Sequence, residues 1–119
     1  MARAFVIHLH TGHGPAHYDL MIEQGEALAT WQVPHSPVES RPGDACAARR
    51  LPDHRKAYLT YEGPVSRGRG QVERIDRGTC ELWETGEQVW RFRLTGERLA
   101  GEFELCREVD EDWTLRRIS

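Results

Sequence analysis

Apolar and polar residues alternate along most of the chain with a period of two, which is typical of β-strands buried on one face. Tyr18, Leu20 and Ile22, for example, alternate with His17 and other polar residues before a turn that carries Gly25. The segment around this turn therefore predicts a hairpin over residues 16–33. The expected strands lie at residues 3–9, 17–23, 27–33, 90–94, 99–105 and 113–117.

Helical periodicity is weak throughout the sequence. Residues 45–51 could form one short helix between two prolines, and residues 34–55 lack alternation, so we expect a long loop with a functional role there. Turn signals recur at a spacing of about 8–12 residues, which favours a barrel or a sandwich. We predict an all-β fold, a small closed antiparallel β-barrel that forms a single domain over residues 1–119.

Two turns are predicted in the second half of the chain. Residues 76–79, with the sequence DRGT, are expected to turn between two short strands. Residues 95–98 are expected to form a four-residue loop that places Leu94 opposite Leu99 and Arg91 opposite Glu102.

Composition narrows the functional classes. The chain has 119 residues and a net charge of −3, which argues against binding nucleic acid through overall charge alone but leaves room for a local basic site. No apolar run is long enough to span a membrane, and the first residues lack a signal-peptide pattern. The three cysteines form no CxxC motif, which favours a reducing compartment. We expect a cytoplasmic protein without membrane association.

Histidines cluster near the N-terminus. His8, His10, His13, His17 and Asp19 lie within twelve residues, although the cluster could also be a run of surface histidines. Strand geometry places His8 and His10 on one face, and His17 and Asp19 on one face of the next strand. The link between them contains glycine and proline and allows the chain to reverse. We predict a transition-metal site formed by His10, His17 and Asp19, with His8 and His13 as alternatives for the first ligand.

A second set of polar residues follows later in the chain. His54, preceded by Asp53 and followed at +4 by Tyr58, could contact a phosphate or transfer a proton, since histidine titrates near neutral pH. His35 could play the same role as His54. Both histidines could equally be solvated loop residues. Two arginine pairs, Arg49–Arg50 and Arg67–Arg69, could bind phosphate or could simply face solvent.

Several segments occur in the order found in one known family. They are a first strand ending at His10, HYDLMIE at 17–23, WQVPHSP at 31–37, DH at 53–54 with Tyr58, DRGT at 76–79 and FRLTGERLAGEFEL at 92–105. In this order they resemble the phosphoesterase domain that begins bacterial DNA ligase D, and its stand-alone relatives.

This resemblance implies a small β-barrel that processes DNA 3′ ends during end joining. Members of the family remove a 3′-phosphate with Mn²⁺ and trim a terminal ribonucleoside. The resemblance implies that His10, His17 and Asp19 hold a divalent metal, with Mn²⁺ the expected ion and Zn²⁺ the alternative. It also implies that His54 contacts the scissile phosphate with Tyr58 beside it. We expect DNA or RNA-containing 3′ ends as partners, and a separately encoded ligase or polymerase. His35 and Arg49 complete the expected substrate contacts.

The chain departs from the family pattern at positions that bind phosphate. Met21 and Cys46 stand where arginine is expected, and His35 stands where lysine is expected. Each charge-assisted contact contributes roughly 1.5–3 kcal/mol. Loss of all three should weaken phosphate binding. The ordered motifs and the intact set of His10, His17 and Asp19 nevertheless make a metal-dependent phosphoesterase, a hydrolase, the leading hypothesis. The rival hypotheses are a catalytically degenerate metal-binding module that binds a nucleic-acid end or a protein partner, and a non-haem iron oxygenase.

Overall fold

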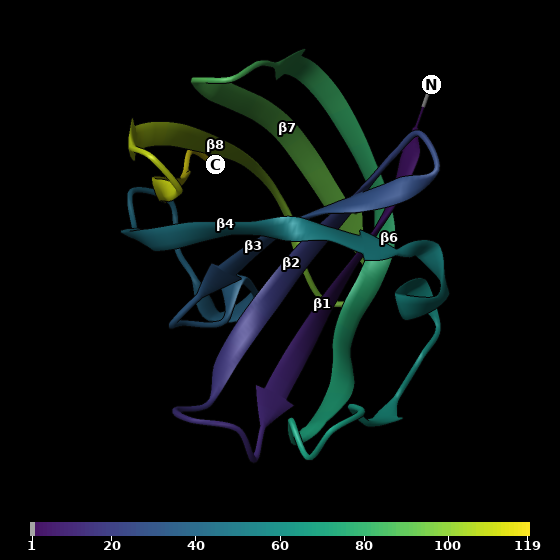
Figure 1. Cartoon of the computed structure of the whole chain (residues 1–119). Coiled ribbons are helices and arrows are strands. Elements are labelled where there is room, and N and C mark those ends of the chain that lie inside the picture. The colour runs from purple at the N-terminus through teal and green to yellow at the C-terminus, as the bar shows by residue number, and fades with distance from the viewer. Residues whose placement is uncertain (1) are drawn as a thin grey trace.

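The computed structural model describes residues 2–119 and contains a closed barrel of eight antiparallel strands (Figure 1). Around the barrel the strands follow the order β1, β2, β3, β4, β9, β8, β7 and β6, and β6 pairs with β1 to close it, while β5 adds to β6 outside the ring. The predicted all-β barrel is confirmed. The bounds are β1 (Arg3–Thr11), β2 (His17–Gln24), β3 (Ala27–Val33), β4 (Ala45–Arg55), β5 (Gly63–Pro64), β6 (Gln71–Thr85), β7 (Val89–Gly96), β8 (Ala100–Val109), β9 (Asp112–Arg117) and the 3₁₀ turns η1 (Pro37–Glu39) and η2 (Lys56–Leu59).

The barrel interior is filled by large apolar side chains from the strands. The Trp31 ring packs edge-on against Trp90, with ring centroids 4.8 Å apart, and against Trp113 at 5.7 Å. Phe92 stacks on Phe103 at 6.0 Å, and all of these side chains are almost completely buried. This burial of apolar surface is the main source of stability for the barrel.

A second, smaller apolar cluster lies on the outer face of β1, β2 and β3. Val6, Met21 and Leu28 are fully buried there, and Tyr58 and Leu59 of η2 pack over them. The strands around this cluster are therefore covered on both faces, and η2 is held against the same outer face from which the even-numbered residues of β1 project.

The segment of residues 34–55 is the main departure from prediction. Residues 45–51, expected as a short helix, belong to β4, which pairs with β3 on one side and β9 on the other. The loop prediction was therefore wrong beyond residue 44. The alternation was hidden because the inward positions are small or polar: Cys46 and Ala48 pack on the core, and the Arg50 guanidinium lies 4.4 Å from the centroid of the Trp31 ring.

The two predicted turns also need correction. Residues 76–79 continue inside the long strand β6 instead of turning. The β7–β8 hairpin turns over two residues, Glu97 and Arg98, so Leu94 pairs with Gly101 instead of Leu99, and Arg91 pairs with Glu104 instead of Glu102. The tight turn forms because the buried Asp76 carboxylate accepts hydrogen bonds from its backbone N–H groups.

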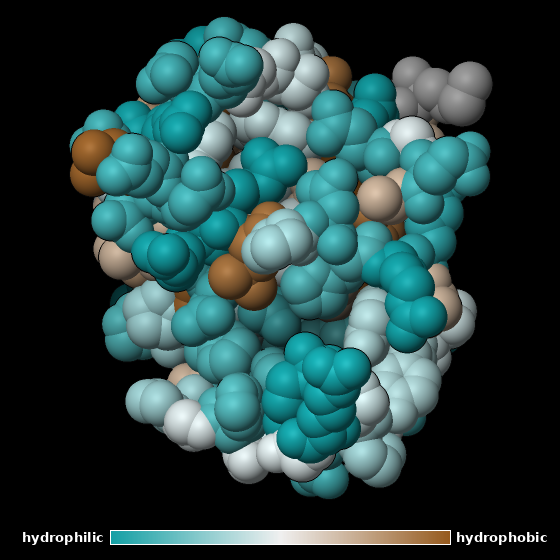
Figure 2. All heavy atoms as spheres, in the orientation of Figure 1, coloured by the Kyte–Doolittle hydropathy of each residue, from teal (hydrophilic) through white to brown (hydrophobic). Residues whose placement is uncertain are grey.

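The surface shows no broad apolar face in the view of Figure 2, where hydrophobic side chains are scattered among hydrophilic ones. Between residues 2 and 119, no helix has the length and apolar character needed to cross a membrane.

Candidate metal centre

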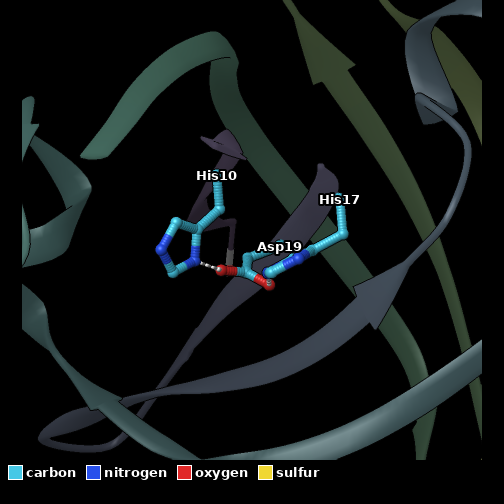
Figure 3. A group of neighbouring side chains, drawn as sticks. All are labelled: His10, His17 and Asp19. Atoms are coloured by element: carbon cyan, nitrogen blue, oxygen red, sulfur yellow. Dashed lines mark ion pairs between the residues drawn. The ribbon is translucent and has the colours of Figure 1, made fainter. Parts of the chain in front are cut away.

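Three side chains converge where β1 ends and β2 begins. His10 pairs directly with His17 across the two strands, and Asp19 follows two residues later on the same face of β2 (Figure 3). Their nearest ligand atoms all lie within 4.8 Å of one another. The His10 Nδ1 atom lies 3.9 Å from Asp19 Oδ2, and His17 Nε2 lies 3.5 Å from Asp19 Oδ1. The predicted convergence of His10, His17 and Asp19 is present in the fold.

Backbone carbonyl groups fix which nitrogen of each imidazole faces the carboxylate. His10 Nε2 lies 2.6 Å from the Arg69 carbonyl oxygen, and His17 Nδ1 lies 3.2 Å from the Pro15 carbonyl oxygen. Because a carbonyl oxygen can only accept, these two nitrogens carry the protons. In the neutral rings, His10 Nδ1 and His17 Nε2 are left with free lone pairs directed toward Asp19. This is the arrangement found in protein metal sites, where an outer partner orients each ligating imidazole.

The carboxylate of Asp19 sits in an environment that suits a cation. The residue is 4% exposed, and its Oδ1 atom has no hydrogen-bond partner among residues 2–119. Burial raises the pKa of Asp19 above its usual value, while the nearby His17, His54 and His10 act in the opposite direction. Two imidazole lone pairs and one buried carboxylate facing each other form a donor set that fits a divalent transition metal.

The alternative ligands His8 and His13 lie outside this group. His8 is opposite Asp19 in the strand register, but its ring packs edge-on against Tyr58 with centroids 6.1 Å apart. Burial, followed by the neighbouring Arg74 charge, lowers the pKa of His8 to about 4. His13 is exposed and stacks on His10 at 6.4 Å.

His54 and Tyr58 lie next to the metal centre. His54 pairs with Leu28 on the outer face of β3, and its charge is close enough to lower the pKa of Asp19. The His54 Nδ1 atom lies 3.0 Å from the Pro52 carbonyl oxygen, so Nδ1 carries a proton and Nε2 remains available. Tyr58 of η2 packs edge-on against His54 with ring centroids 5.6 Å apart.

The remaining predicted substrate residues occupy two different places. Arg49 lines a groove of about 480 Å³ together with His13, His17 and Gln32, so it reaches the same surface as the metal centre. His35 instead lines a different pocket of about 190 Å³ together with Cys46. Thus Arg49 and His17 line one groove, whereas His35 lines a different pocket.

Met21, which replaces an expected arginine, has a clear packing role. It is fully buried in the outer cluster with Val6 and Leu28 beneath η2. A methionine fills such an irregular apolar gap without requiring a partner for a charge. Met21 therefore makes apolar contact with η2 at a position where the resemblance implied a cation.

Sequence reasoning missed Arg74 on β6. It pairs directly with His8, and its Nε and Nη1 atoms are buried without a hydrogen-bond partner in the described part of the chain. No local motif marks this residue, because its neighbour His8 is distant in sequence and a bulge between Ile7 and His8 shifts the register. The only signal in the sequence is the position of Arg74 itself, a charged residue within a segment predicted to be a strand.

The fold and the converging ligands define a small β-barrel domain with a candidate divalent-metal centre on its outer face. The sequence profile of the DNA ligase D 3′-phosphoesterase domain matches residues 8–107, a range that includes all three converging side chains. The chain belongs to this family, as the ordered motifs predicted.

Curated relatives agree with this assignment. The chain is 30% identical to the multifunctional non-homologous end joining protein LigD of Mycobacterium bovis over 96% of its length, which spans 16% of that protein. It is 32% identical to the LigD protein of Pseudomonas aeruginosa PAO1 over 76% of its length, which spans 12% of that protein. The chain thus corresponds to a small part of these larger multifunctional proteins.

Proposed function

We propose that this chain is a divalent-metal-dependent phosphoesterase that acts on nucleic-acid 3′ ends in end-joining DNA repair, removing a 3′-phosphate or a 3′-ribonucleoside. The observation that carries the proposal is the convergence of His10, His17 and Asp19 within 4.8 Å in a chain of this family. The names of its relatives, which describe end-joining proteins, support the repair context. A ligase or polymerase encoded separately is the partner that this context implies.

His10, His17 and Asp19 would hold the metal, through Nδ1, Nε2 and the carboxylate respectively. Mn²⁺ is the expected ion and Zn²⁺ the alternative, since imidazole and carboxylate ligands serve both. When bound, the ion would supply Lewis-acid polarisation of a phosphoryl oxygen and an activated water. The Arg69 and Pro15 carbonyl groups keep both imidazoles in the correct tautomer and orientation.

His54 is the proposed catalytic residue. Its Nδ1 proton is committed to the Pro52 carbonyl oxygen, so Nε2 is the atom that can contact the scissile phosphate or deliver a proton to the leaving oxygen. Tyr58 packs against the His54 ring and restricts its rotation. The Tyr58 side chain is also proposed to contact the substrate beside this ring.

Arg49 is proposed to bind the nucleic-acid strand leading to the reacting end. Its groove begins beside His17, and its guanidinium is well exposed, with a 3.3 Å contact to Asp112. An exposed guanidinium can exchange this carboxylate for a phosphodiester oxygen without rearrangement of the fold. The position of His35 in a separate pocket favours Arg49 as the substrate contact of the two.

The test is phosphate release from a primer–template that carries a 3′-phosphate, in the presence of MnCl₂. We expect the wild-type protein to release inorganic phosphate and Asp19→Asn to release none, while a 5′-phosphate on the same duplex stays intact. A second substrate that ends in one ribonucleotide tests nucleoside removal. Absence of release from both substrates across a range of pH would reject the proposal.

A second candidate function is a catalytically degenerate module that binds a metal and a nucleic-acid end or a protein partner. The observation that favours it is the loss of expected cations at Met21, His35 and Cys46. This module would leave a 3′-phosphorylated duplex uncleaved in the presence of Mn²⁺ and would bind neither inorganic phosphate nor sulfate. The release assay therefore separates the two functions.

A further inference from the structure

A row of cross-strand pairs runs through the candidate metal centre on the outer face of the barrel. Asp19 pairs with His8 on β1 and with Gln32 on β3, and the row continues to Arg74 on β6 and to Arg49 on β4. Residues paired in this way project from the same face of a sheet. Since adjacent strands lie about 4.8 Å apart, each arginine starts two strands, or about 10 Å, from Asp19.

The two arginines at the ends of this row have different surroundings. The Arg49 side chain is 61% exposed and contacts Asp112. The Nε and Nη1 atoms of Arg74 are instead shielded from water, and nothing within residues 2–119 accepts a hydrogen bond from either atom. Guanidinium nitrogens that have lost water without gaining an acceptor are costly, and such groups in native proteins call for a physical explanation.

The neighbours of Arg74 leave its Nε and Nη1 atoms without an acceptor. His8, which is 1% exposed, has a buried Nε2 atom that also lacks a partner in the described chain. Glu62 accepts a hydrogen bond from the Arg74 backbone N–H at 2.9 Å but from neither of the buried guanidinium nitrogens. Arg74 and His8 thus form a paired set of polar groups on the face of the metal centre with unused hydrogen-bonding capacity.

We propose that Arg74, with His8 beside it, binds a phosphate oxygen of the substrate next to the metal centre. This inference rests on the proposed function, since it takes the ligand to be a phosphate ester. A guanidinium is the side chain best suited to a phosphate, because it offers several N–H donors in one plane. Arg74 thereby supplies positive charge that this chain lacks at Met21 and Cys46.

Binding of inorganic phosphate to the Mn²⁺-loaded protein, measured by titration calorimetry, tests the inference directly. We expect Arg74→Gln to raise the Kd for phosphate by about 10- to 100-fold, as loss of a charge-assisted hydrogen bond predicts. The matched control is Arg77→Gln on the same strand, where the guanidinium pairs with Glu97 at 3.5 Å and is half exposed. The control should bind phosphate like the wild type, and both variants should keep the wild-type affinity for Mn²⁺.

Thermal unfolding in phosphate-free buffer separates ligand binding from a structural role. Removing two shielded guanidinium nitrogens that have no acceptor should leave the Tm of Arg74→Met equal to or above that of the wild type. If the Tm of Arg74→Met falls below that of the wild type by more than the Tm of Arg77→Met does, Arg74 has a structural role and the inference is overturned.

Failure of this inference and failure of the proposed function give different results. Unchanged phosphate affinity in Arg74→Gln, or absence of phosphate binding by the wild type, overturns the inference even if 3′-phosphate is released. Phosphate binding that depends on Arg74 supports the inference even if the release assay is negative, in which case only the proposed activity fails.

Discussion

The Nε2 atom of His10 donates a hydrogen bond to the backbone carbonyl oxygen of Arg69 at 2.6 Å. This contact joins the end of β1 to the loop that precedes β6, and Figure 1 shows these two segments at the same end of the barrel. The loop can approach so closely because Gly70 lies against Thr11: a Cβ atom at Gly70 would be 2.0 Å from the Thr11 carbonyl oxygen. The orientation of the His10 ring thus depends on a glycine in another segment.

Gly70→Ala should therefore weaken metal binding. The added methyl group pushes the loop away from Thr11 and moves the Arg69 carbonyl from His10, and loss of such an outer partner typically costs about 10- to 100-fold in metal affinity. Titration with Mn²⁺, followed by calorimetry, measures the effect.

Gly68→Ala is the matched control for this prediction. Gly68 has φ +66° and Gly70 has φ +78°, so both substitutions strain the backbone, but a Cβ at Gly68 meets no atom within 4 Å. Equal losses of metal affinity in the two variants would contradict the proposed effect of the close approach.

Metal binding should stabilise the fold through the same three ligands. At a metal concentration about 100 times the Kd, a ligand that binds only the native state adds about 2.7 kcal/mol to the free energy of unfolding. We expect Mn²⁺ to raise the Tm of the wild type and EDTA to reverse the rise. Asp19→Asn should abolish the shift, whereas His13→Ala, which alters an exposed ring outside the ligand group, should preserve it.

The convergence of His10, His17 and Asp19 could be predicted from sequence because these residues are local. His10 and His17 lie on neighbouring strands of one hairpin, and Asp19 follows two residues later, so strand periodicity is enough to place them together. The Arg69 carbonyl could not be predicted in this way, since any residue type carries a backbone carbonyl. Arg74 was also hidden, because its pairing with His8 depends on how the barrel closes between β1 and β6.

The fold shows the same limit at β4. Its inward positions include Ala48 and Arg50, which do not produce an apolar alternation, although both have partners in the core: Ala48 pairs with Trp113, and Arg50 lies over Trp31. A strand whose inward face is completed by side chains from other strands carries little signal of its own. Barrel closure, a non-local property, therefore decides the structure of residues 45–55.

Replacement of His54 should affect turnover more than metal binding. General acid–base catalysis by a positioned histidine contributes about 10²- to 10⁴-fold, so His54→Ala is expected to lower kcat for 3′-phosphate release by this factor. The Mn²⁺ affinity should be unchanged, because His54 lies outside the ligand group. A parallel loss of metal affinity and kcat would show that His54 acts through the metal site.

Asp76 should be essential for the barrel. Its Oδ1 atom accepts hydrogen bonds from the N–H groups of Arg77, Glu97 and Arg98, and its Oδ2 atom accepts one from Leu99. Asp76→Ala leaves the N–H groups of Arg77, Arg98 and Leu99 without this acceptor, while the Glu97 N–H keeps the Arg77 carbonyl oxygen at 3.1 Å. Each unsatisfied donor shielded from water costs about 1–3 kcal/mol. We expect a loss of roughly 3–5 kcal/mol in urea unfolding. Asp76→Asn keeps one acceptor oxygen and should lose less; an equal loss would point to the charge itself.

Stability should fall at alkaline pH because of Cys80. This thiol is fully buried, and burial raises its pKa from 9.0 to about 12. In the unfolded chain the thiol ionises near its ordinary pKa, whereas the folded protein keeps the proton, so rising pH favours unfolding from about pH 9 up to the folded pKa. One pH unit within this window should lower the free energy of unfolding by about 1.4 kcal/mol.

Cys80→Ala isolates this contribution. The substitution lowers the baseline stability because it removes core volume. The quantity to compare is therefore the change in the free energy of unfolding with pH between pH 9 and pH 11. The wild type and Cys80→Ala are both measured by urea unfolding with a reducing agent present. The slope in Cys80→Ala should be shallower by about 1.4 kcal/mol per pH unit. Cys46 and Cys106 also have raised pKa values through partial burial and will leave a residual slope in both proteins. Identical slopes would mean that the core around Cys80 admits water and lets the thiol ionise in the folded state.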